Sequence, residues 1–206
     1  MPPRSRSSCP HIRFELPEGN YLGILISIYE LGTQTSERYK KDDEKVCLIF
    51  ELPDAEATDN GPVTLSKIYT ASLHEKAALR ATVEALLART LSDAKATEGI
   101  DLQQLLGANA SLYVVKTENS GRVRMNIRTI TPITRGMKKA KSYNEHVFYE
   151  IDPRQDIPKD TPEWLATLIK KSKEWTSPID EEEYPVDAED ELPFESPVEE
   201  TVKEPF

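Results

Sequence analysis

The sequence is poor in the residue types from which catalytic, metal-binding and disulfide-bonded sites are built. Its 206 residues include two cysteines, Cys9 and Cys47, and three histidines. Two thiols do not make a disulfide framework, and no spacing of Cys and His resembles a zinc site. A Gly-rich phosphate loop, a nucleophile elbow and a His-Glu-x-x-His motif are all missing. We therefore expect a protein that is not an enzyme and that binds neither a metal nor an organic cofactor.

Long apolar runs are also missing. No stretch approaches the roughly 20 apolar residues that a membrane span needs. The opening stretch MPPRSRSSCP lacks the apolar segment of a signal peptide. These observations predict a soluble, cytoplasmic protein with no membrane partner.

Charge is abundant but unevenly distributed. Residues 179–206 contain twelve acidic residues and one lysine, a net charge of −11. Residues 1–178 have a net charge of +1, and within them residues 111–141 have a net charge of +7. Such asymmetry indicates a binding site for a polyanion together with an acidic interaction tail. A solvated surface with a solubilising tail would give the same composition.

Apolar periodicity divides the chain into strands and helices. Runs of strand length predict five strands, at residues 20–32, 46–52, 63–70, 110–117 and 122–130. One face of the first strand is expected to hold Leu22, Ile24, Ile26 and Ile28. Helical spacing predicts a helix over 72–89 that starts with a Ser72–Glu75 capping box, and another helix over 161–175. The polar stretch 33–45 is predicted to be a loop.

The order of these elements suggests a fold class. Five short strands with a helix between the third and the fourth are typical of an OB-fold barrel, although other small α+β folds share this order. We predict a mainly β, five-stranded OB-fold barrel at residues 19–141. A flexible N-terminal arm at 1–18 precedes it. An extension with a C-terminal helix at 142–178 and a disordered acidic protein-interaction tail at 179–206 follow it.

Basic and aromatic side chains alternate on the predicted strands and loops. Basic side chains follow a phosphate backbone and release its counterions, and aromatic rings stack on unpaired bases. The pattern predicts a groove for single-stranded DNA, with phosphate contacts from Arg122, Arg124, Arg128 and Lys67 and stacking by Tyr29, Tyr39 and Tyr69. Further contacts are predicted from Arg38, Lys40, Lys41, Arg135 and Lys138. Solvated arginines, and tyrosines that close the end of a barrel, would give a similar pattern.

Several stretches resemble a known family. The runs GNYLGILISIYELGTQTSERYKKDDEKVCLIFEL, SKIYTASLHEKAALRATVEALLAR, DLQQLLGANASLYVV and NIRTITPI are similar to the phage- and plasmid-encoded single-stranded DNA-binding proteins of OB-fold type. The likeness covers about residues 19–135, and LGTQ and YTASLHEKAALR are its most specific parts. It implies an OB-fold that coats single-stranded DNA in the cytoplasm of a bacterial host.

The acidic end carries a second resemblance. The sequence DELPF at 190–194 is similar to the tip of the acidic tail of bacterial single-stranded DNA-binding proteins, and EPF closes the chain. In that family the tip docks on replication and repair enzymes, a form of acidic-motif capture. The resemblance implies partner contacts from Asp190, Glu191, Leu192, Pro193, Phe194, Pro205 and Phe206. Two departures are that DELPF is not terminal and that Lys203 lies close to the end.

Together these features predict a protein that binds and protects single-stranded DNA without strong sequence preference. The context would be replication or recombination of a phage or mobile element, with partner enzymes recruited by the tail. A homo-oligomer is compatible with the same features. An alternative is a protein-interaction or inhibitor protein whose OB-like body binds protein and whose tail imitates nucleic acid. A nuclease would need a set of metal-binding carboxylates, which the sequence does not show.

Overall fold

The protein is mainly β in this structure, a computed structural model that describes residues 16–36, 40–55, 61–119, 122–134 and 136–176. Within those ranges the strands are β1 (Gly19–Ser36), β2 (Lys41–Leu52), β3 (Val63–Thr70), β4 (Asn109–Asn119), β5 (Arg122–Pro132) and β6 (Val147–Tyr149). The helices are α1 (Ala78–Leu87), α2 (Asp93–Glu98), the 3-10 helix η1 (Leu102–Leu105), α3 (Glu163–Lys170) and α4 (Lys173–Thr176). None of these helices is long and apolar enough to cross a membrane.

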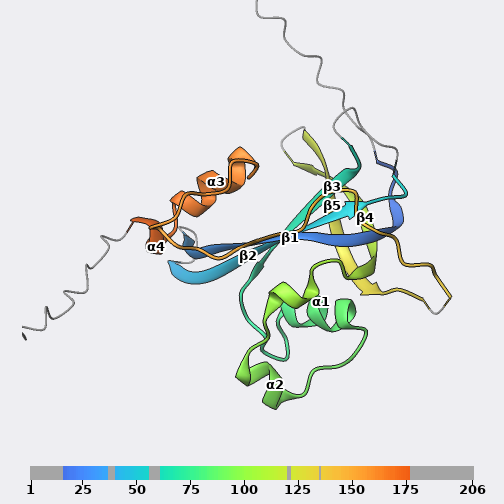
Figure 1. Cartoon of the computed structure of the whole chain (residues 1–206), viewed down its shortest axis with the longest axis horizontal. Helices are drawn as coiled ribbons and strands as arrows, with labels where there is room; N and C mark the ends of the chain where they lie inside the picture. The colour runs from blue at the N-terminus through green and yellow to red at the C-terminus, as the bar shows by residue number, and fades with distance from the viewer. Residues whose placement is uncertain (1–15, 37–39, 56–60, 120–121, 135, 177–206) are drawn as a thin grey trace, which may run out of the picture.

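The strands form one sheet in the order β3-β2-β1-β4-β5, with antiparallel neighbours, and β6 adds to β1 in parallel (Figure 1). The five predicted strands are confirmed, and the helix expected between the third and fourth strands is α1. A closed barrel would require pairing between β3 and β5. No ladder joins these two strands in the described part of the chain, so the expectation of a closed barrel is not met.

The polar stretch 33–45 is strand rather than loop. β1 and β2 pair along a long hairpin that runs from Ile24↔Glu51 to Ser36↔Lys41. Its outer part carries polar side chains on both faces, and this removes the apolar alternation from which a strand is recognised. Backbone hydrogen bonds nevertheless extend the hairpin beyond the core. The predicted end of the first strand at residue 32 and start of the second at residue 46 were therefore wrong.

Strand β1 is buried on both faces, and two hydrophobic clusters share its side chains. The first cluster lies between the sheet and α1, and includes Leu25, Ile28, Leu48, Phe50, Val83 and Leu112. The second lies on the opposite face, and includes Ile24, Ile26, Tyr29, Cys47, Leu165 and Ile169. A bulge shifts the register between Leu25 and Ser27. The prediction that Ile24, Ile26 and Ile28 share one face is therefore wrong, because the bulge turns Ile28 to the α1 side.

The helix boundaries also differ from the predicted ones. Helix α1 begins at Ala78, and its N-cap residue Ala77 makes no capping hydrogen bond through its side chain. The hydroxyl of Ser72 instead accepts a hydrogen bond from the backbone N–H of His74 at 3.3 Å, so the predicted capping box does not form. The C-terminal helix is split into α3 and α4. Helix α2 and strand β6 lack strong apolar periodicity and were not predicted.

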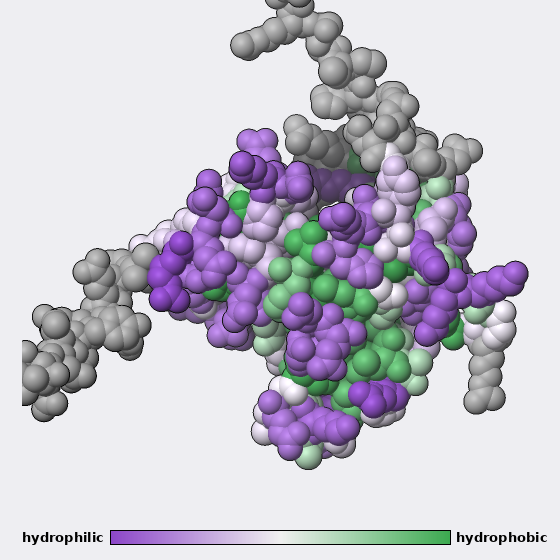
Figure 2. Space-filling view, viewed as in Figure 1, coloured by the Kyte–Doolittle hydropathy of each residue, from purple (hydrophilic) through white to green (hydrophobic). Residues whose placement is uncertain are grey.

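The C-terminal extension packs on the outer face of the β1–β2 hairpin, the face opposite α1 (Figure 1). Leu165 and Ile169 of α3 are buried there beside Tyr149 of β6. The fully buried carboxylate of Glu51 on β2 accepts hydrogen bonds from the backbone N–H groups of Tyr143 (2.8 Å) and Asn144 (2.9 Å). The extension is thus part of the core. In Figure 2 apolar surface gathers in the middle of the view, whereas the surface over α2 and α3 is mostly hydrophilic.

The stretch LGTQ holds the far end of this extension. Thr33 donates hydrogen bonds to the carboxylate of Glu174 from its backbone N–H (2.7 Å) and its hydroxyl (2.5 Å). Burial raises the pKa of Glu174, but the hydrogen bonds from Thr33, from its own backbone and from Ser172 together outweigh burial and hold the pKa below its ordinary value. The amide of Gln34 donates to the carbonyl groups of Leu31 (2.7 Å) and Leu168 (3.0 Å). The residues that carried the family resemblance therefore anchor helices in this structure.

Gly32 allows this close approach. Its φ of +62° is unfavourable for other residues, and a Cβ at this position would meet the Glu174 carboxylate and lie 2.8 Å from Ile151 Cδ1. Gly136 also has a positive φ, of +92°, but open space around it. The two glycines therefore share the backbone constraint, whereas only Gly32 faces steric contact.

We expect Gly32→Ala to destabilise the protein more than Gly136→Ala, which serves as its matched control. Both substitutions carry backbone strain of about 1–3 kcal/mol. Only the methyl group at position 32 must also displace α4 from the hairpin. The free energies of unfolding from urea denaturation measure the difference. Equal losses for the two variants would contradict the docking of α4 described above.

Candidate nucleic-acid interface

The outer face of β4 and β5 presents a row of polar and basic side chains. Thr117 pairs with Arg124 in the register and Val115 pairs with Asn126, so these side chains lie on one face, whereas the pair of Val114 and Ile127 is buried on the other. Arg124, Asn126 and Arg128 are all exposed. The Asn126 amide donates to the hydroxyl of Thr117. The predicted sharing of a face by Arg124, Asn126 and Arg128 agrees with this arrangement.

An exposed tyrosine lies on the same face. Tyr113 of β4 pairs with Thr129 of β5 and with Asn20 of β1, and 39% of its surface is exposed. Tyr113 was not among the site residues predicted from the sequence, because it lies inside the apolar run SLYVV. Strict alternation could have found it, since Leu112 and Val114 on either side of it are buried. The outer face thus combines cationic side chains with an accessible aromatic ring.

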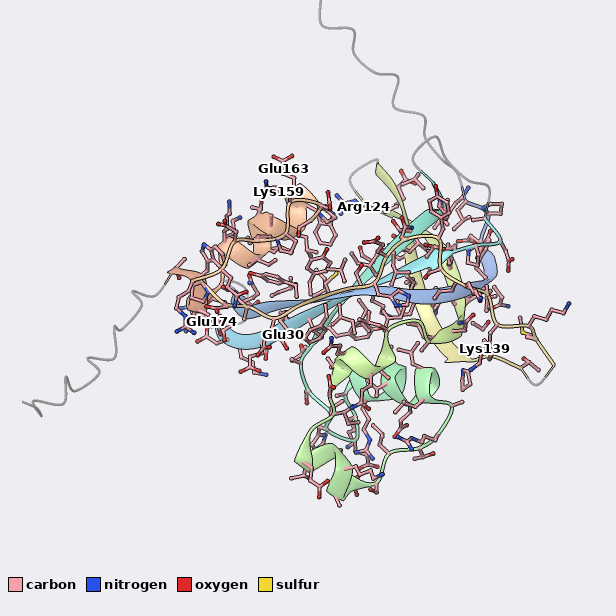
Figure 3. All side chains as sticks on the ribbon, viewed as in Figure 1. Glu30, Arg124, Lys139, Lys159, Glu163 and Glu174 are labelled. Atoms are coloured by element: carbon pink, nitrogen blue, oxygen red, sulfur yellow. The ribbon has the colours of Figure 1, made fainter. Side chains whose placement is uncertain are left out.

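The loop after β5 continues the cationic surface. Lys138 and Lys139 are exposed, and Figure 3 shows Arg124 and Lys139 far apart, at the two ends of the path that runs along β5 and into this loop. Asn109 fixes the loop near its end: its Oδ1 accepts from the backbone N–H of Ala140 at 2.9 Å, and its Nδ2 donates to the Ala140 carbonyl at 3.3 Å. The loop therefore holds its lysines in a defined place beside the sheet.

The described cations of β5 and of the loop after it have no acidic partner, whereas several other cations do. Elsewhere ion pairs join Lys41 and Lys45 to Asp43, Arg80 to Glu84 and Asp93, Arg154 to Asp152, and Lys173 to Asp42. Among the residues that the structure describes, no ion pair involves Arg124, Arg128, Lys138 or Lys139. Exposed ion pairs contribute little to stability, but each one cancels charge that a ligand would otherwise meet. The outer face of β5 and its following loop consequently keep their positive charge.

Tyr29 and Tyr69 do not present their rings to solvent. Tyr29 is 3% exposed and lies beside Tyr149, with 6.1 Å between the ring centroids. Tyr69 is 4% exposed, and its hydroxyl accepts a hydrogen bond from the Thr82 hydroxyl on α1 at 2.9 Å. The expectation that these two rings are available for stacking is corrected, because the extension covers one and α1 covers the other.

Lys67 occupies the gap between β3 and β5. Its side chain points to the same face of the sheet as the buried Tyr69, with the ammonium nitrogen 5.3 Å from the Tyr69 ring centroid. The ammonium donates a hydrogen bond to the backbone carbonyl of Arg128 at 3.3 Å. Burial lowers the pKa of Lys67 below its ordinary value. This amine is engaged by protein, so the structure does not place it as an open phosphate contact.

The basic residues predicted at the β1–β2 turn lie in a mixed-charge environment. Lys40 and Lys41 are both exposed, and Lys41 is paired with Asp43 at 2.9 Å. Lys173 of α4 contacts Asp42 at 2.5 Å, which places this end of the hairpin beside α4. Figure 1 shows the same end well away from β4 and β5. The hairpin lysines and the β5 arginines therefore do not form one continuous cluster.

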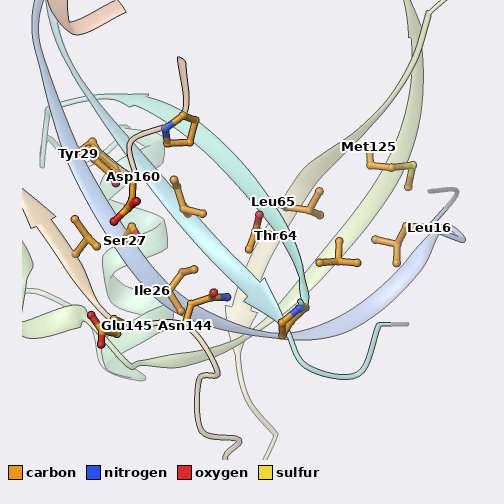
Figure 4. Close-up of a pocket in the computed structure, with 15 residues that line it drawn as sticks. Leu16, Ile26, Ser27, Tyr29, Thr64, Leu65, Met125, Asn144, Glu145 and Asp160 are labelled. Carbon is orange, nitrogen blue, oxygen red and sulfur yellow. The ribbon is translucent and has the colours of Figure 1, made fainter. Parts of the chain in front are cut away.

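A groove of about 760 Å³ opens between the start of β3, β5 and the extension (Figure 4). Its floor is largely apolar, with Ile26 and Ile49 among the lining residues. The charged residues among its described lining are Glu145 and Asp160, with no Lys or Arg among them. A phosphate would be repelled by these two carboxylates, so the groove does not suit a nucleic-acid backbone.

Some predicted positions lie outside the described residues. These are Arg38, Tyr39 and Arg135, residues 1–15 of the N-terminal arm, and the tail residues Asp190, Glu191, Leu192, Pro193, Phe194, Pro205 and Phe206; the end of the arm is described, and Leu16 is buried in the first cluster. The backbone of Arg122 pairs with Asn119 at the end of β5, but its side chain is not described. No group of three or more His, Cys, Asp or Glu in the described ranges could hold a metal ion. No known family model matches the chain, and no curated protein sequence is similar to it.

Replacing Tyr69 with Phe tests the buried state of this ring. Burial raises the pKa of Tyr69 from 10.0 to about 12, although the hydrogen bond from Thr82 acts in the opposite direction. In the unfolded chain the Tyr69 phenol ionises near its ordinary pKa of 10.0, whereas in the folded protein it stays protonated at that pH. The contribution of the Tyr69 phenol to the free energy of unfolding is therefore complete below about pH 10 and is lost as the pH rises towards 12.

At neutral pH we expect Tyr69→Phe to lower the free energy of unfolding by about 1 kcal/mol, since one hydrogen bond is lost. The difference between wild type and variant should narrow as the pH rises through the window given above, and urea denaturation at several pH values measures it. If the difference in the free energy of unfolding does not change with pH, the Tyr69 phenol is exposed to solvent.

Proposed function

We propose that the protein binds single-stranded DNA along the outer face of β4 and β5, without catalysing a reaction. The observation that carries this proposal is the uncompensated charge of Arg124 and Arg128 on an uncovered face that also exposes the Tyr113 ring. The lysines at 138 and 139 extend the path beyond the strand. Lys41, Arg80, Arg154 and Lys173 are paired with acids and are less suited to this role.

The chemistry of this face favours an unpaired strand. Guanidinium and ammonium groups bind phosphates and release counterions whatever the base sequence. An exposed ring stacks on the face of any unpaired base, whereas a duplex keeps its base faces stacked internally. Sequence readout in a duplex uses side chains inserted into a groove, commonly from a helix, and helices α1 and α3 turn their apolar sides to the core. Binding without strong sequence preference follows.

We further infer that the sheet is a partly open OB-fold. Support comes from the strand order β3-β2-β1-β4-β5, from the helix between β3 and β4, and from the approach of β3 to β5 at the Lys67–Arg128 hydrogen bond. The resemblance to phage and plasmid proteins supports a role in replication or recombination of such an element. The likeness of the acidic tail supports recruitment of partner enzymes through residues 190–206.

Charge reversal at Arg124 and Arg128 together tests the proposed face. We expect the double Glu variant to bind labelled oligo-dT at least tenfold more weakly at moderate salt. The slope of log K against log salt should flatten by about 1.4, since each phosphate contact on a single strand contributes about 0.7. Fluorescence anisotropy at several salt concentrations measures both quantities.

The matched control reverses Arg154 and Lys170, which are also exposed but lie on the extension. It changes the net charge by the same amount and should leave the salt slope nearly unchanged. Equal weakening by the two pairs would mean that only the overall charge matters. A wild-type protein with no affinity for oligo-dT would instead favour the protein-interaction alternative.

Tyr113→Ala tests the stacking part of the proposal. Loss of a stacked base should cost about 1–3 kcal/mol of binding free energy, which is roughly a 5- to 150-fold weaker affinity. Tyr113→Phe keeps the ring and should bind nearly as tightly as wild type. Isothermal titration with oligo-dT and with an abasic oligonucleotide of equal length separates stacking from phosphate contacts.

Trp164→Ala is the control for removal of an exposed ring, because Trp164 lies on α3 and is 45% exposed. Its affinity for oligo-dT should equal that of wild type. If Tyr113→Ala and Trp164→Ala behave alike, the ring on β4 has no special role in binding.

A further inference from the structure

The seam between β3 and β5 is the place where the two ends of the sheet path approach each other. No backbone ladder joins these strands in the described ranges. The hydrogen bond from the Lys67 ammonium to the Arg128 carbonyl, at 3.3 Å, spans the gap instead. A side chain of β3 therefore binds the backbone of a residue whose own side chain belongs to the proposed nucleic-acid face.

Arg128 is the extra residue of a β-bulge. The register of β4 and β5 passes from Tyr113↔Thr129 directly to Val114↔Ile127, so Arg128 has no partner position on β4. A bulge interrupts the ladder locally and re-aims side chains, and it leaves a peptide group with fewer restraints than its neighbours. The orientation of the Arg128 guanidinium thus depends on what holds this peptide.

Lys67 is well placed to hold it. The side chain lies on the inner face of β3, between the Tyr69 ring and β5, and the Tyr69 hydroxyl is tied in turn to Thr82 of α1. The chain of contacts connects α1 through Tyr69 and Lys67 to the bulge. Each member is fixed by the one before it, so the Arg128 peptide is bound to the core of the fold.

We propose that Lys67 is a positioning residue for nucleic-acid binding, which acts by fixing the Arg128 bulge so that the guanidinium projects from the outer face. The inference rests on the proposed function and corrects the sequence-based role of Lys67 as a direct phosphate contact. The two roles differ in a measurable way. A positioning residue loses its effect when Arg128 is absent, whereas a direct contact keeps its effect.

A double-mutant cycle with Lys67→Met, Arg128→Ala and their combination distinguishes these roles. Methionine keeps an unbranched side chain over Tyr69 but lacks the donor and the charge. Affinities for labelled oligo-dT are measured at several salt concentrations, after thermal unfolding has identified the temperature range in which all variants are folded.

We expect Arg128→Ala to weaken binding about tenfold, as for loss of one charged hydrogen bond, and Lys67→Met to weaken it several-fold. The double variant should bind as Arg128→Ala does, within about twofold. The salt slope should flatten in each single variant by up to about 0.7, and no further in the double variant. A purely structural effect of Lys67 would lower the melting temperature without changing the salt slope.

Lys45→Met is the matched control. The Lys45 ammonium also bridges neighbouring strands, with a hydrogen bond to the Thr70 hydroxyl at 2.8 Å, but it lies away from the β3–β5 seam. This variant should bind oligo-dT as wild type does.

Three results would overturn the inference. If the double variant loses affinity for oligo-dT by the product of the two single-variant losses, Lys67 is an independent phosphate contact. Unchanged binding by Lys67→Met would leave it a stabilising residue only. In both cases the proposed function stands as long as Arg128→Ala weakens binding, whereas a wild-type protein that does not bind oligo-dT would overturn the function and the inference together.

Discussion

Burial of the β1–β2 hairpin on both of its faces is the constraint on which the rest of the structure depends. Helix α1 packs on one face and the C-terminal extension packs on the other, so the apolar middle of the hairpin is buried from both sides. Uncovered outer surface remains on β3, where Ile68 is 44% exposed, and on β4 and β5. Arg124 and Arg128 lie on the β5 part of this surface, and Lys138 and Lys139 lie in the loop that follows it. Core packing and the position of the candidate site are therefore linked.

Buried or partly buried carboxylates hold the extension to the hairpin. Glu51 binds the backbone at 143–144, and Glu174 binds Thr33 beside the tightly packed Gly32. A buried carboxylate is tolerated only when its oxygen atoms receive hydrogen bonds, and both of these groups do. The stretch LGTQ, which carried the resemblance, thus has a structural explanation that is independent of DNA. Similar residues would be required wherever a helix docks on this hairpin in the same way.

The sequence predicted strands and their order well, because apolar runs of strand length report burial directly. It predicted side-chain direction less well, because one extra residue reverses the face of everything beyond it. The bulge at Ile26 turned Ile28 inward, and the bulge at Arg128 left that arginine outward in spite of the broken alternation. Tyr29 and Tyr69 were expected at the site, but burial of a tyrosine depends on distant segments that cover it. Tyr113 was missed for the opposite reason, since its neighbours in sequence are apolar.

The proposed binding of single-stranded DNA would be indifferent to base sequence because of the kind of contacts that the outer face offers. Alternate side chains of a strand are about 6.6–6.8 Å apart, so Arg124 and Asn126 form a row along the direction of β5. A single strand can adjust its backbone to such a row, whereas a duplex presents phosphates at a rigid spacing of about 3.4 Å per strand along its axis. Neither guanidinium–phosphate contacts nor a stacking ring reads the edge of a base. Under this proposal selectivity would come from the unpaired state itself, because only an unpaired base could place its face on Tyr113 while its phosphate meets the arginines.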